Sequence, residues 1–244
     1  MNDAVHEVVH RWAERPHRAV IFDFNGTLSD DEPILLRIFT ELFSEHLGWR
    51  MSAEDYAERL LGHSDREIVE IAVRKHGGGD QALVERLMER RRGRYAELVA
   101  ARSPITDAAA QLVAALHTSG VPMAIVTGAQ RDDVLAVLDN CATGTRINLL
   151  VTEEDVQRGK PDPEGFTKGA VLMGVEPAHV LVFEDSVPGI RGAVAAGMAC
   201  IAVVGENPRP AVLAEGVATT ARLRAEIFDR TIDPEDGTDG ASSL

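Results

Sequence analysis

Five short runs of apolar residues stand out along the chain. Each run is continuous and does not alternate with polar residues, which is typical of strands buried on both faces of a parallel sheet. Helical patterns lie between most of the runs, and proline opens two of them. The chain therefore predicts an α/β fold with a doubly wound parallel sheet. The predicted strands span 19–22, 121–126, 147–151, 180–183 and 199–204, and the predicted helices span 107–119, 132–139, 163–173 and 188–196.

The stretch between the first two predicted strands is much longer than the dozen or so residues that a crossover needs. It contains no strand pattern and four helical patterns, at 33–47, 53–61, 65–76 and 80–101. We therefore predict an all-helical domain over 31–103, inserted into an α/β core domain formed by 1–30 and 104–232. The first fifteen residues resemble a short helix that caps the core or frays. We expect the polar, glycine-rich tail at 233–244 to be disordered.

The charge of the chain narrows the choice of partners. Its 244 residues include 25 Lys and Arg against 39 Asp and Glu, so the formal net charge is −14. Such an acidic chain is a poor binder of nucleic acid and of anionic membrane surfaces. The two cysteines make no disulfide framework and the N-terminus has no secretory pattern, so we expect a cytoplasmic protein. We expect neither nucleic acid nor membrane as a partner.

Polar side chains follow the predicted strands. In an open parallel sheet the carboxyl ends of the strands meet at one edge, where ligands bind. Three carboxylates, one hydroxyl and one lysine come to this edge, and they are Asp23, Glu184, Asp185, Thr127 and Lys160. Several carboxylates at one point repel each other unless a cation lies among them, and oxygen ligands suit Mg²⁺. The set favours phosphoryl transfer through an aspartate.

Individual roles follow from the residue types. Asp23 is a candidate for both nucleophile and metal ligand. Thr127, Lys160 and the main-chain N–H groups near Gly26 and Thr27 are candidates for holding phosphoryl oxygens. The chain has no Gly-x-x-x-x-Gly-Lys-Ser/Thr loop and no Gly-x-Gly-x-x-Gly after its first strand. This argues against a nucleotide P-loop and against a dinucleotide site.

Four motifs resemble, in their order, those of the haloacid dehalogenase (HAD) superfamily. They are FDFNGTL at 22–28, IVTGA at 125–129, GKPDP at 159–163 and VLVFEDSVPGIRGAVAAGM at 180–198. The resemblance covers about residues 18 to 205 and implies a Rossmann-like core. The helical insertion is similar to the C1 cap of subfamily I. The nearest look-alikes are the β-phosphoglucomutase and sugar-phosphate phosphatase group.

By this resemblance, Asp23 is the nucleophile, Thr127 the phosphate-binding hydroxyl and Lys160 the lysine that neutralises charge. Mg²⁺ is the implied cofactor, and a small phosphorylated metabolite, foremost a sugar phosphate, is the implied substrate. The resemblance implies that Asp23, Asp185 and the main-chain carbonyl of Asn25 bind the metal, and that Glu184 supports it directly or through water. The implied phosphate-binding residues are Gly26, Thr27, Thr127, Gly128 and Lys160.

One position departs from the family pattern. Asn25 stands where the family has an aspartate that acts as general acid and base. A carboxamide neither gives nor takes a proton near pH 7, and the loss of such a group typically lowers the rate by ~10²–10⁴. Four interpretations stay open. The first is that the substrate has a leaving group that needs little protonation, and the second is that Asp30 or Asp31 substitutes for the missing acid. The third is that Asn25 was introduced by mutation or deamidates. The fourth is that the chain binds phosphate compounds with little turnover.

The segment RLLGHSDREIVE at 59–70 has a Gly-x-Ser turn that opens a helix. By the resemblance, this turn of the cap reads the substrate, and Arg59, His63 and Arg66 are the candidates. The alternative is that Ser64 simply caps the helix, with Glu67 as its capping-box partner. We interpret the basic run at 89–95 as a solvated helix face.

The sequence thus predicts a Mg²⁺-dependent, HAD-type phosphohydrolase of small phosphorylated metabolites that acts through an aspartyl phosphate on Asp23. The alternative functions are a phosphometabolite-binding protein with vestigial catalysis and a phosphohexomutase. The mutase is disfavoured most, because it needs the acid at position 25 in both halves of its cycle.

Overall fold

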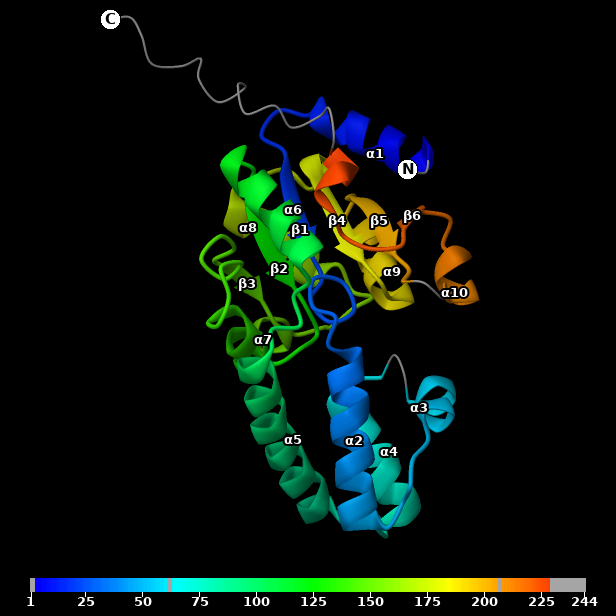
Figure 1. Ribbon diagram of the computed structural model, residues 1–244. Coiled ribbons are helices and arrows are strands. Elements are labelled where there is room, and N and C mark those ends of the chain that lie inside the picture. Colours follow the sequence, from blue (N-terminus) through cyan, green and yellow to red (C-terminus); the bar gives the residue numbers. More distant parts are fainter. Residues whose placement is uncertain (1–2, 61–62, 206–207, 229–244) are drawn as a thin grey trace, which may run out of the picture.

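The computed structural model describes residues 3–60, 63–205 and 208–228, and within them six strands form one parallel sheet. The spatial order is β3-β2-β1-β4-β5-β6, which confirms the predicted doubly wound α/β fold. The central strand β1 therefore lies between β2 and β4 (Figure 1). The strands are β1 Ala19–Phe22, β2 Met123–Val126, β3 Leu149–Val151, β4 Val180–Glu184, β5 Ala199–Val203 and β6 Ala218–Thr220.

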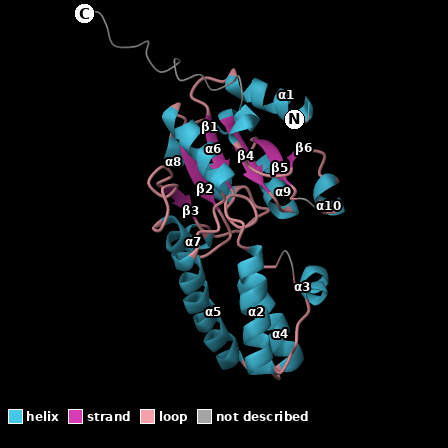
Figure 2. Ribbon diagram, viewed as in Figure 1, coloured by secondary structure: helices cyan, strands magenta, loops and turns pink. Residues whose placement is uncertain are grey.

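The helices predicted between the first two strands are confirmed. They are α2 Glu32–Leu47, α3 Ala53–Arg59, α4 Asp65–His76 and α5 Gln81–Ala101. We call residues 31–103 the helical insert, and it stands beyond the carboxyl ends of the strands (Figures 1 and 2). Its limits as a domain stay a prediction. Outside the insert the helices are α1 Asp3–Ala13, α6 Asp107–Thr118, α7 Arg131–Leu138, α8 Glu164–Met173, α9 Val187–Ala195 and α10 Pro210–Leu213.

Both connections between insert and core lie side by side. The main-chain N–H of Asp30, just before α2, donates to the carbonyl of Pro104, just before α6, at 3.0 Å. The predicted tail at 233–244 lies outside the described residues. No helix among the described residues is both long and apolar enough to cross a membrane.

The sheet is covered by helices on both faces because its strand side chains alternate between two apolar clusters. Val20 and Phe22 point into one cluster with α1 and α6, and Ala19 and Ile21 point into the other with α8 and α9. The first cluster continues into the helical insert, where it includes buried side chains of α2, α4 and α5. The insert therefore packs on the same core that supports β1.

Some elements were not predicted. The edge strand β6 is short and contains two threonines, so it leaves no apolar run in the sequence. Helix α1 was predicted to cap the core or fray, and it packs firmly. Trp12 is buried there, its Nε1 donates to the carbonyl of Ala19 at 3.0 Å, and its ring meets that of Phe228 at 5.2 Å.

The interpretation of residues 89–95 as a solvated face is wrong for two of its residues. Arg91 and Tyr95 of α5 are buried, and the Arg91 guanidinium lies 4.5 Å from the centre of the Tyr95 ring. The guanidinium pairs with Asp65 of α4 and Asp133 of α7, so one buried cation joins two helices of the insert to the core. The charge of the run concealed this role, because exposed and paired arginines look alike in a sequence.

Arg91→Ala should lower the free energy of unfolding by about 3–5 kcal/mol, because it leaves buried carboxylates without their cation. Urea denaturation followed by circular dichroism measures the change. Arg94→Ala is the matched control, since Arg94 lies on the exposed side of the same helix and its ion pair within the described part of the chain is with the exposed Glu97. Its unfolding midpoint should not move. Similar midpoints for both variants would contradict the role of Arg91.

Candidate active site

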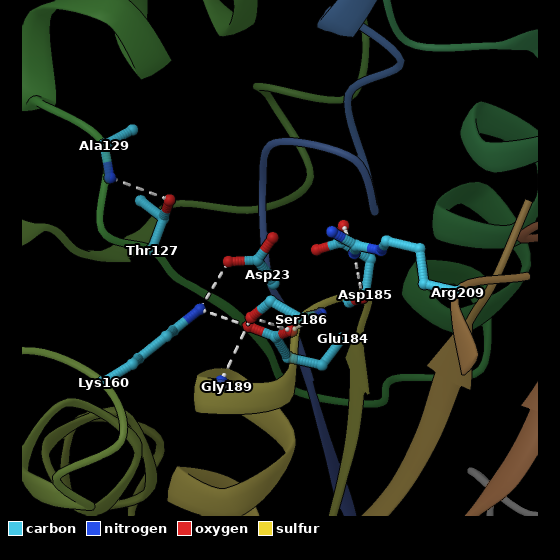
Figure 3. A network of polar contacts seen from close by, with 9 residues as sticks. All are labelled: Asp23, Thr127, Ala129, Lys160, Glu184, Asp185, Ser186, Gly189 and Arg209. Atoms are coloured by element: carbon cyan, nitrogen blue, oxygen red, sulfur yellow. Dashed lines mark hydrogen bonds and ion pairs between the residues drawn. The ribbon is translucent and has the colours of Figure 1, made fainter. Parts of the chain in front are cut away.

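The pairing of β1 with β4 brings the predicted acids together. Phe22 lies opposite Phe183, and the N–H of Asp23 donates to the Phe183 carbonyl at 2.9 Å. Asp23 therefore leaves β1 beside Glu184, the last residue of β4. One carboxylate oxygen from each of Asp23, Glu184 and Asp185 lies within 4.8 Å of the others (Figure 3).

Lys160 reaches this cluster from the loop between β3 and α8. Its Nζ lies 2.5 Å from Asp23 Oδ1 and 2.7 Å from Glu184 Oε1 (Figure 3). Burial opposes the charge of the ammonium, but the carboxylates of Asp23 and Glu184 outweigh it and raise the pKa of Lys160. The lysine is therefore a permanent cation between two acids.

The acids still carry more negative charge than one lysine neutralises. Burial raises the pKa of Asp23 to about 7; Lys160 opposes this shift and Glu184 adds to it. Burial, together with the charges of Glu184 and Asp23, raises the pKa of Asp185 well above its ordinary value. The site offers only oxygen atoms as ligands and carries an excess of negative charge, and both properties fit Mg²⁺. Burial is the largest cause of both shifts, and a bound divalent cation would favour the ionised form of both carboxylates.

Glu184 is held at both of its oxygens. Oε1 accepts from Lys160, and Oε2 accepts from the N–H of Ser186 at 2.6 Å and from its hydroxyl at 2.9 Å. Ser186 caps α9 by accepting from the N–H of Gly189 at 3.1 Å. A Cβ at Gly189 would lie 1.7 Å from Oε1, so the helix start has room for Glu184 only because residue 189 is glycine. Glu184 thus ties Lys160 to the start of α9.

Asp185 has a partner that sequence reasoning missed. Arg209, from the segment after β5, donates to the Asp185 carbonyl at 2.5 Å and to its Oδ2 at 2.9 Å. On its other side, a Cβ at Gly26 would lie 2.7 Å from Oδ2. Gly26 also has a φ of +76°, which disfavours any other residue. The same edge rule that found the acids, extended to the end of β5, would have indicated Arg209.

The predicted phosphate-binding residues form two groups. Thr127 follows β2 and is buried, and its Oγ1 accepts from the N–H of Ala129 at 3.1 Å. A small cavity of about 40 Å³ lies among Thr127, Gly128 and Lys160. In the turn after Asp23, the N–H of Gly26 donates to Ser29 and that of Thr27 donates to Phe24. These two N–H groups are bonded within the turn, and their role as phosphate donors stays a prediction.

Asn25 contacts an acid. Its Nδ2 donates to Asp31 Oδ2 at 2.6 Å, and the Tyr95 hydroxyl donates to the same oxygen at 2.5 Å. Burial raises the pKa of Asp31 to about 6, although both hydrogen bonds lower it. Asp30 is exposed. Of the two acids considered as substitutes for the missing aspartate, Asp31 is the one whose side chain is hydrogen-bonded to Asn25 within the described residues.

Each of the three predicted cap residues lies beside a carboxylate of the helical insert. Arg59 pairs with Asp55 at 2.9 Å, Arg66 pairs with Glu85 at 2.8 Å, and His63 lies 3.7 Å from Glu67. Their role in substrate recognition stays a prediction. The capping alternative for Ser64 is confirmed, because its hydroxyl accepts from the N–H of Glu67 and the Glu67 carboxylate accepts from the N–H of Ser64.

Comparison with known proteins agrees with this architecture. The family model of haloacid dehalogenase-like hydrolases matches residues 20–203. Validoxylamine A 7'-phosphate phosphatase of Streptomyces hygroscopicus subsp. limoneus is 30% identical over 76% of this chain and 84% of its own length. A phosphorylated carbohydrates phosphatase of Thermotoga maritima is 27% identical over 74% of this chain and 82% of its own.

Solved structures show the same fold. CbbY from Rhodobacter sphaeroides, in complex with phosphate, superposes with a TM-score of 0.71 at 24% identity, over 86% of this chain and 96% of that one. The family match spans the strands from β1 to β5 and the helical insert, and ends before β6. The chain therefore belongs to the haloacid dehalogenase-like hydrolase family and is an enzyme of its phosphatase type.

Proposed function

We propose that the chain is a Mg²⁺-dependent phosphohydrolase of small phosphorylated metabolites, foremost sugar phosphates, and that Asp23 is its nucleophile. The observation that carries the proposal is the bridge from Lys160 to Asp23 and Glu184, next to Asp185, at the carboxyl edge of the sheet. A protein that only binds phosphate has no need of a carboxylate held in this way. The phosphatase names of two relatives support the substrate class.

The proposed reaction has two displacements. Lys160 holds Oδ1 of Asp23, and a carboxylate oxygen of Asp23 attacks phosphorus while the bond from phosphorus to the leaving oxygen breaks. The leaving oxygen then takes a proton from solvent, because the carboxamide of Asn25 cannot give one, and the water that attacks in the second step returns a proton to solvent. Water attacks the aspartyl phosphate, the bond from phosphorus to Asp23 breaks, and inorganic phosphate leaves with the carboxylate restored. Thr127 and Lys160 hold the phosphoryl oxygens.

Asp23, Asp185 and the carbonyl of Asn25 would hold Mg²⁺. When bound, the ion would supply positive charge to the phosphoryl oxygens. The chain's own contribution is to fix these oxygen donors. Arg209 and Gly26 confine the Asp185 carboxylate, and Lys160 confines that of Asp23.

Asp23→Asn should abolish phosphate release and any covalent phosphoryl-enzyme, because a carboxamide is a poor nucleophile. Phosphate release and intact mass after rapid quenching measure both. Asp107→Asn is the control, because Asp107 is an exposed carboxylate in the first turn of α6. Activity that survives in Asp23→Asn, after repurification excludes a contaminant, would overturn the assignment.

Mg²⁺ should bind more weakly as the pH falls. The pKa of Asp23 is raised to about 7 by burial, so below that pH the carboxyl holds a proton that Mg²⁺ must displace. Calorimetry should show an affinity that falls by up to about tenfold per pH unit below pH 7 and levels above it. Asp185→Ala should weaken binding sharply at every pH, and Asn25→Ala should change it little. No binding at millimolar Mg²⁺ would overturn the metal proposal.

Position 25 should set the preference for leaving groups. Sugar alkoxides need a proton to leave, whereas aryl and acyl phosphates leave as weak bases. Asn25→Asp should therefore raise hexose-phosphate turnover by up to ~10²–10⁴ and barely change the turnover of an aryl phosphate. Steady-state kinetics on both substrates measure the ratio, and intact mass excludes deamidation of the parent. If the ratio of hexose-phosphate to aryl-phosphate turnover does not change, the phosphometabolite-binding alternative gains support. Asn25 is the sequence feature that specifically favours that alternative.

A further inference from the structure

The carboxylate of Asp31 lies beside Asn25 and does not cap the helix that it precedes. Asp31 is fully buried and immediately precedes α2. An aspartate at this position usually accepts hydrogen bonds from the first N–H groups of the helix, worth about 1 kcal/mol. The Asp31 side chain makes no such bond, and only its main-chain carbonyl accepts from Ile34 and Leu35. The carboxylate is used elsewhere.

Both of its hydrogen bonds converge on one oxygen. Oδ2 accepts from Asn25 Nδ2 at 2.6 Å and from the Tyr95 hydroxyl at 2.5 Å. Oδ1 is buried and has no hydrogen-bond partner among the described residues. A buried carboxylate with one unpaired oxygen works against stability. The carboxylate is therefore better explained by the two hydrogen bonds that it accepts, one of which comes from Asn25.

A carboxylate only accepts hydrogen bonds, so it can bind the nitrogen end of the carboxamide and not the oxygen end. Asn25 is thereby left with its Oδ1 and one remaining N–H proton for other partners. The oxygen and nitrogen ends of a side-chain amide have nearly the same shape. Without this constraint the amide could therefore rotate by 180° and exchange the two ends. We propose that Asp31, held by Tyr95, is a positioning residue that selects which end of the Asn25 amide faces the substrate.

The contact also joins the helical insert to the loop after β1. Tyr95 belongs to α5, Asp31 lies at the first connection, and Asn25 belongs to the loop. Tyr95 is itself fixed, because its ring lies against the Arg91 guanidinium, which pairs with Asp133 of the core. The orientation of Asn25 therefore depends on how the insert sits on the core.

The first test needs no substrate and no metal. In a ¹H–¹⁵N spectrum, one side-chain amide proton of Asn25, assigned by its loss in Asn25→Ala, should be shifted downfield and protected from exchange. Asp31→Leu should abolish the protection, and Asp31→Asn, which keeps an acceptor oxygen, should retain part of it. Tyr95→Phe should weaken it, while Tyr56→Phe, which alters a buried tyrosine of α3, should not.

The second test exchanges the two groups, and it rests on the proposed function. Asn25→Asp alone sets two carboxylates in contact, and they repel. Asn25→Asp with Asp31→Asn restores a carboxylate–carboxamide pair with the acid now beside the leaving group. The double variant should turn over a hexose phosphate about tenfold faster than the single variant, the size of one charge-assisted hydrogen bond. The gain should appear in kcat with little change in KM.

The outcomes separate the two proposals. The positioning role would be overturned if the Asn25 amide proton stayed protected from exchange in both Asp31→Leu and Tyr95→Phe. If Asp31→Leu does not fold, the comparison of amide protection in Tyr95→Phe and in Tyr56→Phe decides the question. Equal kcat values for the single and double variants would also overturn it. If no variant releases phosphate from any substrate, the proposed function fails, and the amide spectrum still decides the role of Asp31.

Discussion

The ammonium group of Lys160 lies between the carboxylates of Asp23 and Glu184, and the arrangement of the site depends on this contact. Without a cation, acids brought together by adjacent parallel strands would repel each other or take up protons. Lys160 holds one oxygen of Asp23 in place, and through Glu184 it is tied to the start of α9. The loop after β3 is thereby fixed to the ends of β1 and β4.

Much of this could be predicted because parallel strands impose simple geometry. A continuous apolar run identifies a buried strand, and the residue after it lies at a known edge. Asp23, Thr127 and Asp185 were found in this way. The register that sets Phe22 opposite Phe183 then brings Asp23 beside Glu184, and no further information was needed.

The contacts that escaped prediction join residues far apart in the sequence or use a residue against its usual behaviour. Arg91 belongs to a run that looks solvated, and only its contacts with Asp65 and Asp133 show that it is buried. Asp31 looks like a helix cap and instead meets Tyr95, 64 positions away. Arg209 reaches Asp185 from a segment with no apolar pattern. The contacts of Arg91 and of Asp31 are set by the packing of the helical insert, which a single sequence does not encode in its periodicity, whereas Arg209 and Asp185 both lie outside the insert.

The hydrogen bond from Asp30 to Pro104 has a consequence for how such a protein can diversify. Since the two connections already meet, residues 31–103 leave the core and rejoin it at the same place, as a closed loop does. The length of a flexible loop enters the free energy of folding only logarithmically. A segment that replaced residues 31–103 would still have to preserve the apolar contacts that α2, α4 and α5 make with the core and the ion pair of Arg91 with Asp133. Lys160 and the carboxylates of Asp23, Glu184 and Asp185 come from outside the segment, whereas Asp31, Asp65 and Tyr95 come from within it. A change in the segment therefore leaves the origin of these acids unchanged but alters the surroundings of Asn25, whose amide contacts Asp31.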